Sequence, residues 1–161
     1  MKVGTDGVLL GAWAPVGQAA RILDVGTGTG LIALQMAQRN SLARVTAVEI
    51  DTAAAAQARQ NVAGSPWGER IEVVCADFEV FCPDEPYDLI VSNPPYFVDA
   101  LRCPDGRRSQ ARHAGSLNYV SLFRHAAGLL SREGRVSVIV PSEVAGQAED
   151  AAWTHGFYPE H

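Results

Sequence analysis

The chain has 161 residues, of which 47% are apolar and 19% are charged, a balance typical of one folded domain rather than of a disordered segment. Its net charge of −5 is not that of a general nucleic-acid binder, and no apolar run approaches the length that crosses a membrane. The three cysteines and four histidines lack the spacing of metal ligands, and the opening residues lack the pattern of a signal peptide. We therefore expect a cytoplasmic protein with reduced thiols and no metal, and the sequence assigns no oligomeric state.

Helical and strand patterns alternate along the whole chain. The predicted helices cover residues 5–13, 31–38, 51–62, 118–130 and 142–153. The predicted strands cover residues 21–25, 44–49, 70–75, 87–91 and 135–140. The alternation predicts a single α/β domain over residues 1–161, with a mostly parallel sheet and helices on both faces.

Local signals set some of the expected boundaries. Thr5 or Asp6 is expected to cap the first helix, and Asp51 or Thr52 the third. Residues 133–134 are expected to form the turn before the last strand. Because the chain stops soon after the last helix, the fifth strand would lie at an uncovered sheet edge. We therefore expect a fragment that lacks further strands, and also residues before the first one here.

The first predicted strand runs into Asp24-Val25-Gly26-Thr27-Gly28-Thr29-Gly30. Glycines let a ligand approach the backbone closely, and the N-terminus of the following helix favours polar or anionic groups. A dinucleotide-binding turn requires Gly-x-Gly-x-x-Gly, but this chain has Leu31 at the last glycine position. Asp24 also suits a cofactor that carries an ammonium group. The spacing therefore favours S-adenosylmethionine.

Two further acids follow the next two strands. Glu49 would hold ribose hydroxyls, and Asp77 would accept from an adenine amine. Ile50 and Phe78 would lie on either side of the adenine ring. The plainer interpretation is that each acid caps a helix or turn. Acids at the ends of three successive parallel strands, where open α/β sheets bind ligands, favour the binding interpretation.

The fourth predicted strand ends at Ser92-Asn93-Pro94-Pro95-Tyr96-Phe97. Two consecutive prolines end the strand, because they donate no ladder hydrogen bond and hold the preceding residue extended. The Asn93 side chain and the Pro94 carbonyl offer two acceptors, enough for both hydrogens of an exocyclic amine. Tyr96 would stack on the ring that carries this amine, next to the glycine-rich turn at residues 24–30. The plainer interpretation is a turn with a surface tyrosine.

Together these motifs resemble the class I S-adenosylmethionine-dependent methyltransferases, which have a Rossmann-like three-layer fold. The corner formed by residues 92–97, after the fourth predicted strand, resembles the corresponding motif of the members that methylate amino groups of adenine, guanine or glutamine. Three further stretches resemble the bacterial tRNA(Val) adenine N6-methyltransferases, which modify the adenosine just after the anticodon. These stretches are residues 1–14, residues 65–67 and residues 108–112.

The resemblance implies methyl transfer from S-adenosylmethionine to the N6 amine of that adenosine. It implies that residues 1–17 close over the cofactor and that residues 98–117 recognise the target. The catalytic residues it implies are Asn93, Pro94, Pro95 and Tyr96. The cofactor-binding residues it implies are Gly4, Thr5, Asp24, Gly26, Gly28, Gly30, Glu49, Ile50, Asp77 and Phe78. The substrate-binding residues it implies are Phe97, Arg107, Arg108 and Arg112.

Residues 98–113 hold four arginines against two aspartates, which gives a tRNA backbone a local basic surface despite the acidic total. The plainer interpretation is a solvated loop. Other functions stay open. They are methylation of a protein glutamine amide or of an RNA guanine N2, a non-catalytic cofactor- or tRNA-binding module, and a nicotinamide-dependent oxidoreductase, which the glycine spacing disfavours.

Overall fold

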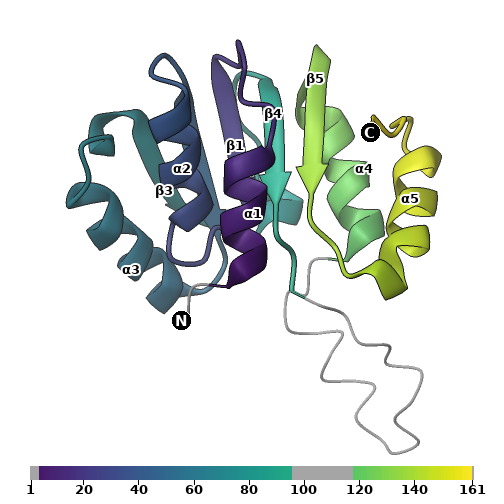
Figure 1. Cartoon of the computed structure of the whole chain (residues 1–161), viewed down its shortest axis with the longest axis horizontal. Coiled ribbons are helices and arrows are strands. Elements are labelled where there is room, and N and C mark those ends of the chain that lie inside the picture. Colours follow the sequence, from purple (N-terminus) through teal and green to yellow (C-terminus); the bar gives the residue numbers. More distant parts are fainter. Residues whose placement is uncertain (1–3, 96–117, 161) are drawn as a thin grey trace, which may run out of the picture.

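The computed structural model describes residues 4–95 and 118–160. In this part of the chain one sheet has the strand order β3-β2-β1-β4-β5, and all neighbouring strands are parallel (Figure 1). The strands are β1 (Arg21–Val25), β2 (Arg44–Glu49), β3 (Ile71–Cys75), β4 (Tyr87–Ser92) and β5 (Leu130–Val138). The predicted parallel sheet is confirmed. The strand order reverses between β1 and β4, which is where open α/β sheets bind ligands.

Helices cover both faces of the sheet (Figure 1). They are α1 (Thr5–Trp13), α2 (Leu31–Arg39), α3 (Thr52–Ala63), α4 (Tyr119–Leu129) and α5 (Ala145–Thr154). Alternate strand residues point to opposite faces. On β1, Ile22 packs in the core with α1 and α2, whereas Leu23 packs in the core with α4. Helix α5 packs on α4 and β5, so the expected three-layer arrangement is present.

The first helix begins one residue earlier than a Thr5 cap would place it. Its N-cap is Gly4, which makes no side-chain cap hydrogen bond, so the prediction of a Thr5 or Asp6 cap is wrong. Both residues lie inside the first turn, where their side chains are not in the capping position. By contrast, Asp51 caps α3 as predicted, because its carboxylate accepts from the Ala54 N–H at 2.7 Å.

The last strand also begins earlier than predicted. Residues 133–134 lie within β5, so the prediction of a turn there is wrong. The pairing with β4 shifts register between Tyr87 and Leu89, which is the signature of a bulge. Gly134 is packed tightly in this bulge, since an added Cβ would lie 2.8 Å from the Leu130 side chain and 3.0 Å from the Tyr87 carbonyl oxygen. In the described sheet β5 lies at one edge, as expected.

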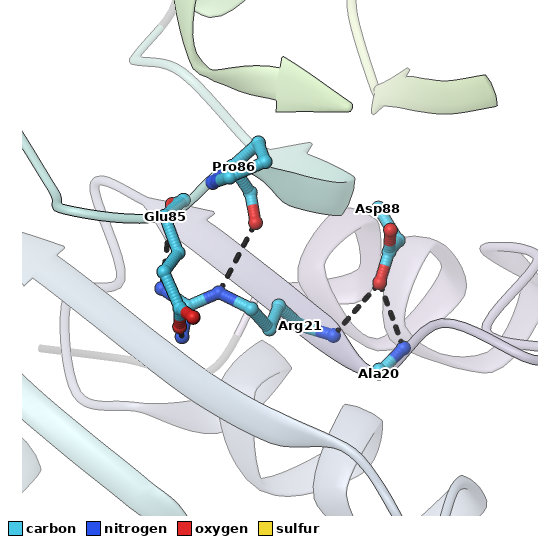
Figure 2. A network of polar contacts seen from close by, with 5 residues as sticks. All are labelled: Ala20, Arg21, Glu85, Pro86 and Asp88. Carbon is cyan, nitrogen blue, oxygen red and sulfur yellow. Dashed lines mark hydrogen bonds and ion pairs between the residues drawn. The ribbon is translucent and has the colours of Figure 1, made fainter. Parts of the chain in front are cut away.

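A polar network joins β1 and β4 at their amino-terminal ends (Figure 2). Asp88 Oδ2 accepts from the backbone N–H groups of Ala20 at 2.9 Å and Arg21 at 3.1 Å. The Arg21 guanidinium donates to Glu85 Oε2 at 2.8 Å and to the Pro86 carbonyl at 3.1 Å. The network fixes the start of β1 against the start of β4. It therefore helps to set which residues of the two strands meet at the opposite edge.

The Asp88 carboxylate also reaches β5. Burial by itself would raise the pKa of Asp88, but the Arg21 N–H, the Ser131 hydroxyl and the Ala20 N–H all donate to the carboxylate, and Arg21 adds a positive charge. These interactions prevail, so the pKa of Asp88 lies below its ordinary value. The ionised form is thus the one that ties the three strands together.

The carboxyl end of α2 is held by the side chain of Arg70. Its Nη1 donates to the carbonyl oxygens of Asn40 and Ala43, both at 2.9 Å, and its Nη2 donates to the Ala37 carbonyl at 2.6 Å. The last carbonyls of a helix lack partners within the helix, so these bonds satisfy groups that would otherwise need water. Helix α2 begins directly after the glycine-rich turn, and Arg70 secures its far end.

Within residues 4–95 and 118–160, no helix has the length and apolar character needed to cross a membrane.

Replacing Arg70 by methionine keeps the aliphatic stem but removes the three donors. We expect the free energy of unfolding to fall by ~1–3 kcal/mol, because charged hydrogen bonds to backbone carbonyls are lost. Urea denaturation measures this loss. The matched control is Arg59→Met, which removes one exposed bond of 3.3 Å to the Val73 carbonyl and should change the free energy by no more than ~0.5 kcal/mol. An equal loss in both variants would contradict the role given to Arg70.

Candidate functional site

The glycine-rich turn and the Asn-Pro-Pro corner lie side by side at the carboxyl edge of the sheet. In the β1–β4 ladder Val25 pairs with Ser92, so Gly26 and Asn93 are the residues that directly follow the two strands. The buried Ser92 hydroxyl donates to the Val25 carbonyl at 2.9 Å, across a sequence separation of 67 residues. The two motifs therefore begin at the same point of the sheet.

Each of the three glycines in the turn has a left-handed backbone. The φ angles are 70° at Gly26, 59° at Gly28 and 86° at Gly30, and L side chains rarely adopt such values. The N–H groups of Gly26 and Thr27 both donate to the Val48 carbonyl, at 2.9 and 3.1 Å. The end of β2 thus holds the start of the turn, and Gly30 then forms the N-cap of α2.

Asp24 is fully buried directly before this turn. Its Oδ2 accepts from the Thr27 hydroxyl at 2.6 Å and from the Ala33 N–H at 3.0 Å, whereas within the described residues its Oδ1 has no partner. Burial, with a smaller contribution from the charge of Glu49, raises the pKa of Asp24 to about 7 against the effect of those two hydrogen bonds. The site therefore contains a buried acceptor that a cationic ligand would satisfy.

Glu49 braces the turn from β2. Its Oε2 accepts from the Gly28 N–H at 2.8 Å, and its Oε1 accepts from the Asp51 N–H at 2.9 Å. The side chain is largely buried, with a relative exposure of 9%. A carboxylate oxygen accepts more than one hydrogen bond, so both oxygens keep capacity for a ligand hydroxyl. Both the binding interpretation and the plainer turn-capping interpretation of Glu49 thus fit its position.

The residues predicted to surround an adenine differ in exposure. Asp77 caps a short 3₁₀ turn (Phe78–Val80) by accepting from the Glu79 N–H at 2.9 Å. Ile50 follows β2 and is 49% exposed. The Phe78 ring is only 5% exposed and meets the His125 ring of α4 edge-on, with the ring centroids 4.8 Å apart. Ile50 therefore offers a ligand ring far more free surface than Phe78 does.

The corner after β4 is held close to the first helix. Asn93 is half-buried, Pro94 is buried and Pro95 is exposed. A Cβ built on Gly7 of α1 would lie 3.8 Å from Asn93 Nδ2. Gly4 and Thr5, which are predicted to bind the cofactor, lie at this end of α1 and are exposed.

Some predicted site residues lie outside the described residues: Tyr96, Phe97, Arg107, Arg108 and Arg112. Among the residues that the structure does describe, no cluster of three or more His, Cys, Asp or Glu side chains is placed to bind a metal ion. Two residues without a predicted role belong to the site, namely Thr27, which donates to Asp24, and Gly7, which packs near Asn93. The position of Thr27 between two glycines was the one sequence signal for its role.

Comparison with known proteins agrees with this arrangement. Residues 5–148 match the sequence profile of the family described as Methyltransferase small domain. A tRNA1(Val) (adenine(37)-N6)-methyltransferase of Bacteroides fragilis is 54% identical over 99% of this chain, and the match covers 68% of that protein. The protein of the same name from Bacteroides thetaiotaomicron is 56% identical over 98% of this chain and 67% of its own length. The chain thus spans about two thirds of these relatives, as expected of a fragment.

Solved structures agree on the fold. TrmN from Thermus thermophilus superposes with a TM-score of 0.66 and 25% identity, over 90% of this chain and 40% of that one. The protein Atu636 from Agrobacterium tumefaciens, titled a predicted O-methyltransferase, superposes with a TM-score of 0.70 and 24% identity, over 91% of this chain and 66% of that one. The expected Rossmann-like methyltransferase fold is confirmed. By sequence and by architecture, this chain belongs to the tRNA1(Val) (adenine(37)-N6)-methyltransferase family and is built on a methyltransferase small domain.

Proposed function

We propose that this chain transfers a methyl group from S-adenosylmethionine to the N6 amine of adenosine 37 in tRNA1(Val). The observation that carries the proposal is the junction of β1 and β4, where the Ser92 hydroxyl bonds the Val25 carbonyl at 2.9 Å. This junction lies where the proposed cofactor-binding turn and the proposed amine-binding corner begin. The names of relatives that are 54% and 56% identical support this substrate.

The residues present fit an adenosyl cofactor with an amino-acid tail. When bound, S-adenosylmethionine supplies a methyl group made electrophilic by its sulfonium. Asp24 Oδ1, which has no partner among residues 4–95 and 118–160, would accept from the ammonium of the tail, next to the three glycines of the turn. Glu49 would accept from the ribose hydroxyls while it continues to hold the Gly28 N–H. The glycine-rich turn is thus already braced by Glu49 and by the Val48 carbonyl before a ligand enters.

The residues after β2 and β3 would bind the adenine end of the cofactor, and the start of α1 would bind the methionine end. Asp77 would accept from the adenine amine, and Ile50 would cover the adenine ring, with only the rim of Phe78 available on the other side. Gly4 and Thr5 would border the methionine end, with residues 1–17 closing over it. This division agrees with the exposure of Ile50, Gly4 and Thr5 at the carboxyl edge.

Asn93 and Pro94 would bind the target amine. The lone pair of adenine N6 is delocalised into the ring, so the amine is a poor nucleophile. Two acceptors that take its hydrogens would turn the lone pair toward the methyl group and stabilise the positive charge that develops on nitrogen. The carbonyl of the buried Pro94 is held in direction, because the Pro94 ring fixes φ and the following Pro95 restricts ψ. Bond formation to N6 would leave the electron pair of the broken sulfur–methyl bond on the sulfur, in the thioether of S-adenosylhomocysteine. The methylated nitrogen, which is strongly acidic, would release its proton to water.

The recognition of tRNA is assigned to the segment that follows the corner. Tyr96 would stack on the unstacked adenine, an interaction that returns ~1–3 kcal/mol, with Phe97 beside it. Residues 98–117 would recognise the target, with Arg107, Arg108 and Arg112 contacting phosphates. We place the protein in the cytoplasm, where tRNA is processed in bacteria.

Replacing Asn93 by alanine tests the amine-binding corner. We expect the rate of methyl transfer to tRNA to fall by about 10²-fold, since one electrostatic contact in a transition state contributes on this scale. Calorimetric affinity for S-adenosylhomocysteine should change by less than about twofold. The matched control is Asn93→Asp, which keeps an acceptor oxygen and should retain more activity than the alanine variant. Parallel loss of rate and cofactor affinity would contradict the assignment.

The buried Asp24 predicts that cofactor binding depends on pH. Its carboxyl ionises as the pH rises through about 7, and only the ionised form attracts an ammonium group. The affinity for S-adenosylhomocysteine should therefore increase by about fivefold from pH 6 to pH 7. Calorimetric titrations at several pH values measure this slope. In Asp24→Asn the slope should disappear, and a slope that persists there would show that another group is responsible.

The basic segment predicts a salt effect. Changing both Arg107 and Arg108 to alanine should weaken binding of a tRNA transcript and reduce the slope of log affinity against log salt concentration by about 1.4–1.8. Filter binding over a range of potassium chloride concentrations measures the slope. The control is the double variant Arg44→Ala and Arg132→Ala, which removes the same charge from β2 and β5. If both double variants lower the slope equally, the segment has no specific role in binding tRNA.

A further inference from the structure

Helix α1 comes close to both halves of the site at Gly7. A Cβ built on this buried glycine would lie 3.6 Å from Leu31 Cδ2 and 4.0 Å from Ile32 Cδ1. Leu31 and Ile32 open α2 directly after the cofactor turn. The same Cβ would lie 3.8 Å from Nδ2 of Asn93, which belongs to the amine-binding corner. A single backbone position thus faces the cofactor side and the substrate side together.

The conformation of α1 does not itself require glycine at this position. Gly7 is not among the described residues with a positive φ, and in a helix glycine costs up to ~1 kcal/mol relative to alanine. The useful property is therefore the absent side chain. One turn later Gly11 is packed against the side chain of Gln35. Helix α1 therefore approaches α2 closely at two glycines, Gly7 and Gly11. At Gly7, but not at Gly11, the same close approach also includes Asn93.

We propose that Gly7 is a positioning residue, whose small size lets Asn93 pack close to α1 and so sets the separation between the amine acceptor and the cofactor turn. This inference rests on the proposed function. A methyl group at position 7 makes ordinary van der Waals contacts at 3.6–4.0 Å and fits. A longer side chain needs the space that Asn93, Leu31 and Ile32 occupy. Small displacements of a positioned group slow a reaction strongly, so the effect should have a sharp size threshold.

The experiment compares Gly7→Ala, Gly7→Val and Gly7→Leu in the full chain, with tRNA1(Val) transcript and labelled S-adenosylmethionine. We expect the alanine variant to lose the least kcat of the three and to melt at a higher temperature, since alanine favours the helix. We expect the leucine variant to lose at least about tenfold in kcat, with affinity for S-adenosylhomocysteine changed by less than about twofold. Gly146→Leu is the control, because that α5 position has no heavy atom within 4 Å of an added Cβ.

A double variant separates positioning from general packing. If position 7 acts through Asn93, adding Gly7→Leu to Asn93→Ala should cause little further loss of kcat. Losses that multiply would overturn the proposal, as would full kcat in the leucine variant or equal losses of kcat and S-adenosylhomocysteine affinity. If circular dichroism shows the leucine variant unfolded, the valine variant is judged by the same criteria. Failure of the unaltered chain to methylate any tRNA would instead overturn the proposed function, and this inference with it.

Discussion

The parallel pairing of β1 with β4 is the constraint on which the site depends. Neither motif suffices alone, because a methyl transfer requires the donor and the acceptor at one place. The pairing of Val25 with Ser92, reinforced by the hydrogen bond between them, brings together two motifs that are far apart in the sequence. Ser92 is fully buried, so this bond is shielded from competing water. The register of β1 against β4 therefore determines that the two motifs lie next to each other.

Charge at the carboxyl edge is organised around the glycine turn. Glu49 uses both oxygens to hold backbone N–H groups, whereas Asp24 keeps one buried oxygen without a described partner. An acid with both oxygens bonded to the backbone stabilises the loop, and one with an oxygen left over provides binding energy for a cation. The fold thus places an incompletely satisfied buried acid where a ligand is expected, a pattern common at functional sites.

Much of the fold follows from local sequence. The strands over residues 21–25 and 44–49 match the structure, because β-branched runs bounded by turn residues are strong local signals. The motifs at residues 24–30 and 92–97 are also visible in the sequence, because glycine spacing marks the first and two consecutive prolines mark the second. What sequence could not give depends on distant contacts. The bulge at the start of β5 arises from its pairing with β4, and the burial of Phe78 arises from core packing that includes residues of α4, a helix far along the chain. The closeness of Gly7 to Asn93 is likewise a tertiary contact.

The Asp88 network has a consequence for how such proteins diversify. It anchors the strands at their amino-terminal ends (Figure 2), opposite the glycine-rich turn and the Asn-Pro-Pro corner. Strand alignment is thus partly secured at a distance from the segments that we propose to bind substrate. Loops at the carboxyl edge are then free to change length and composition without shifting the ladder. Exchange of the segment after Pro95 alone offers a route by which evolution or engineering redirects the same scaffold to a different amine.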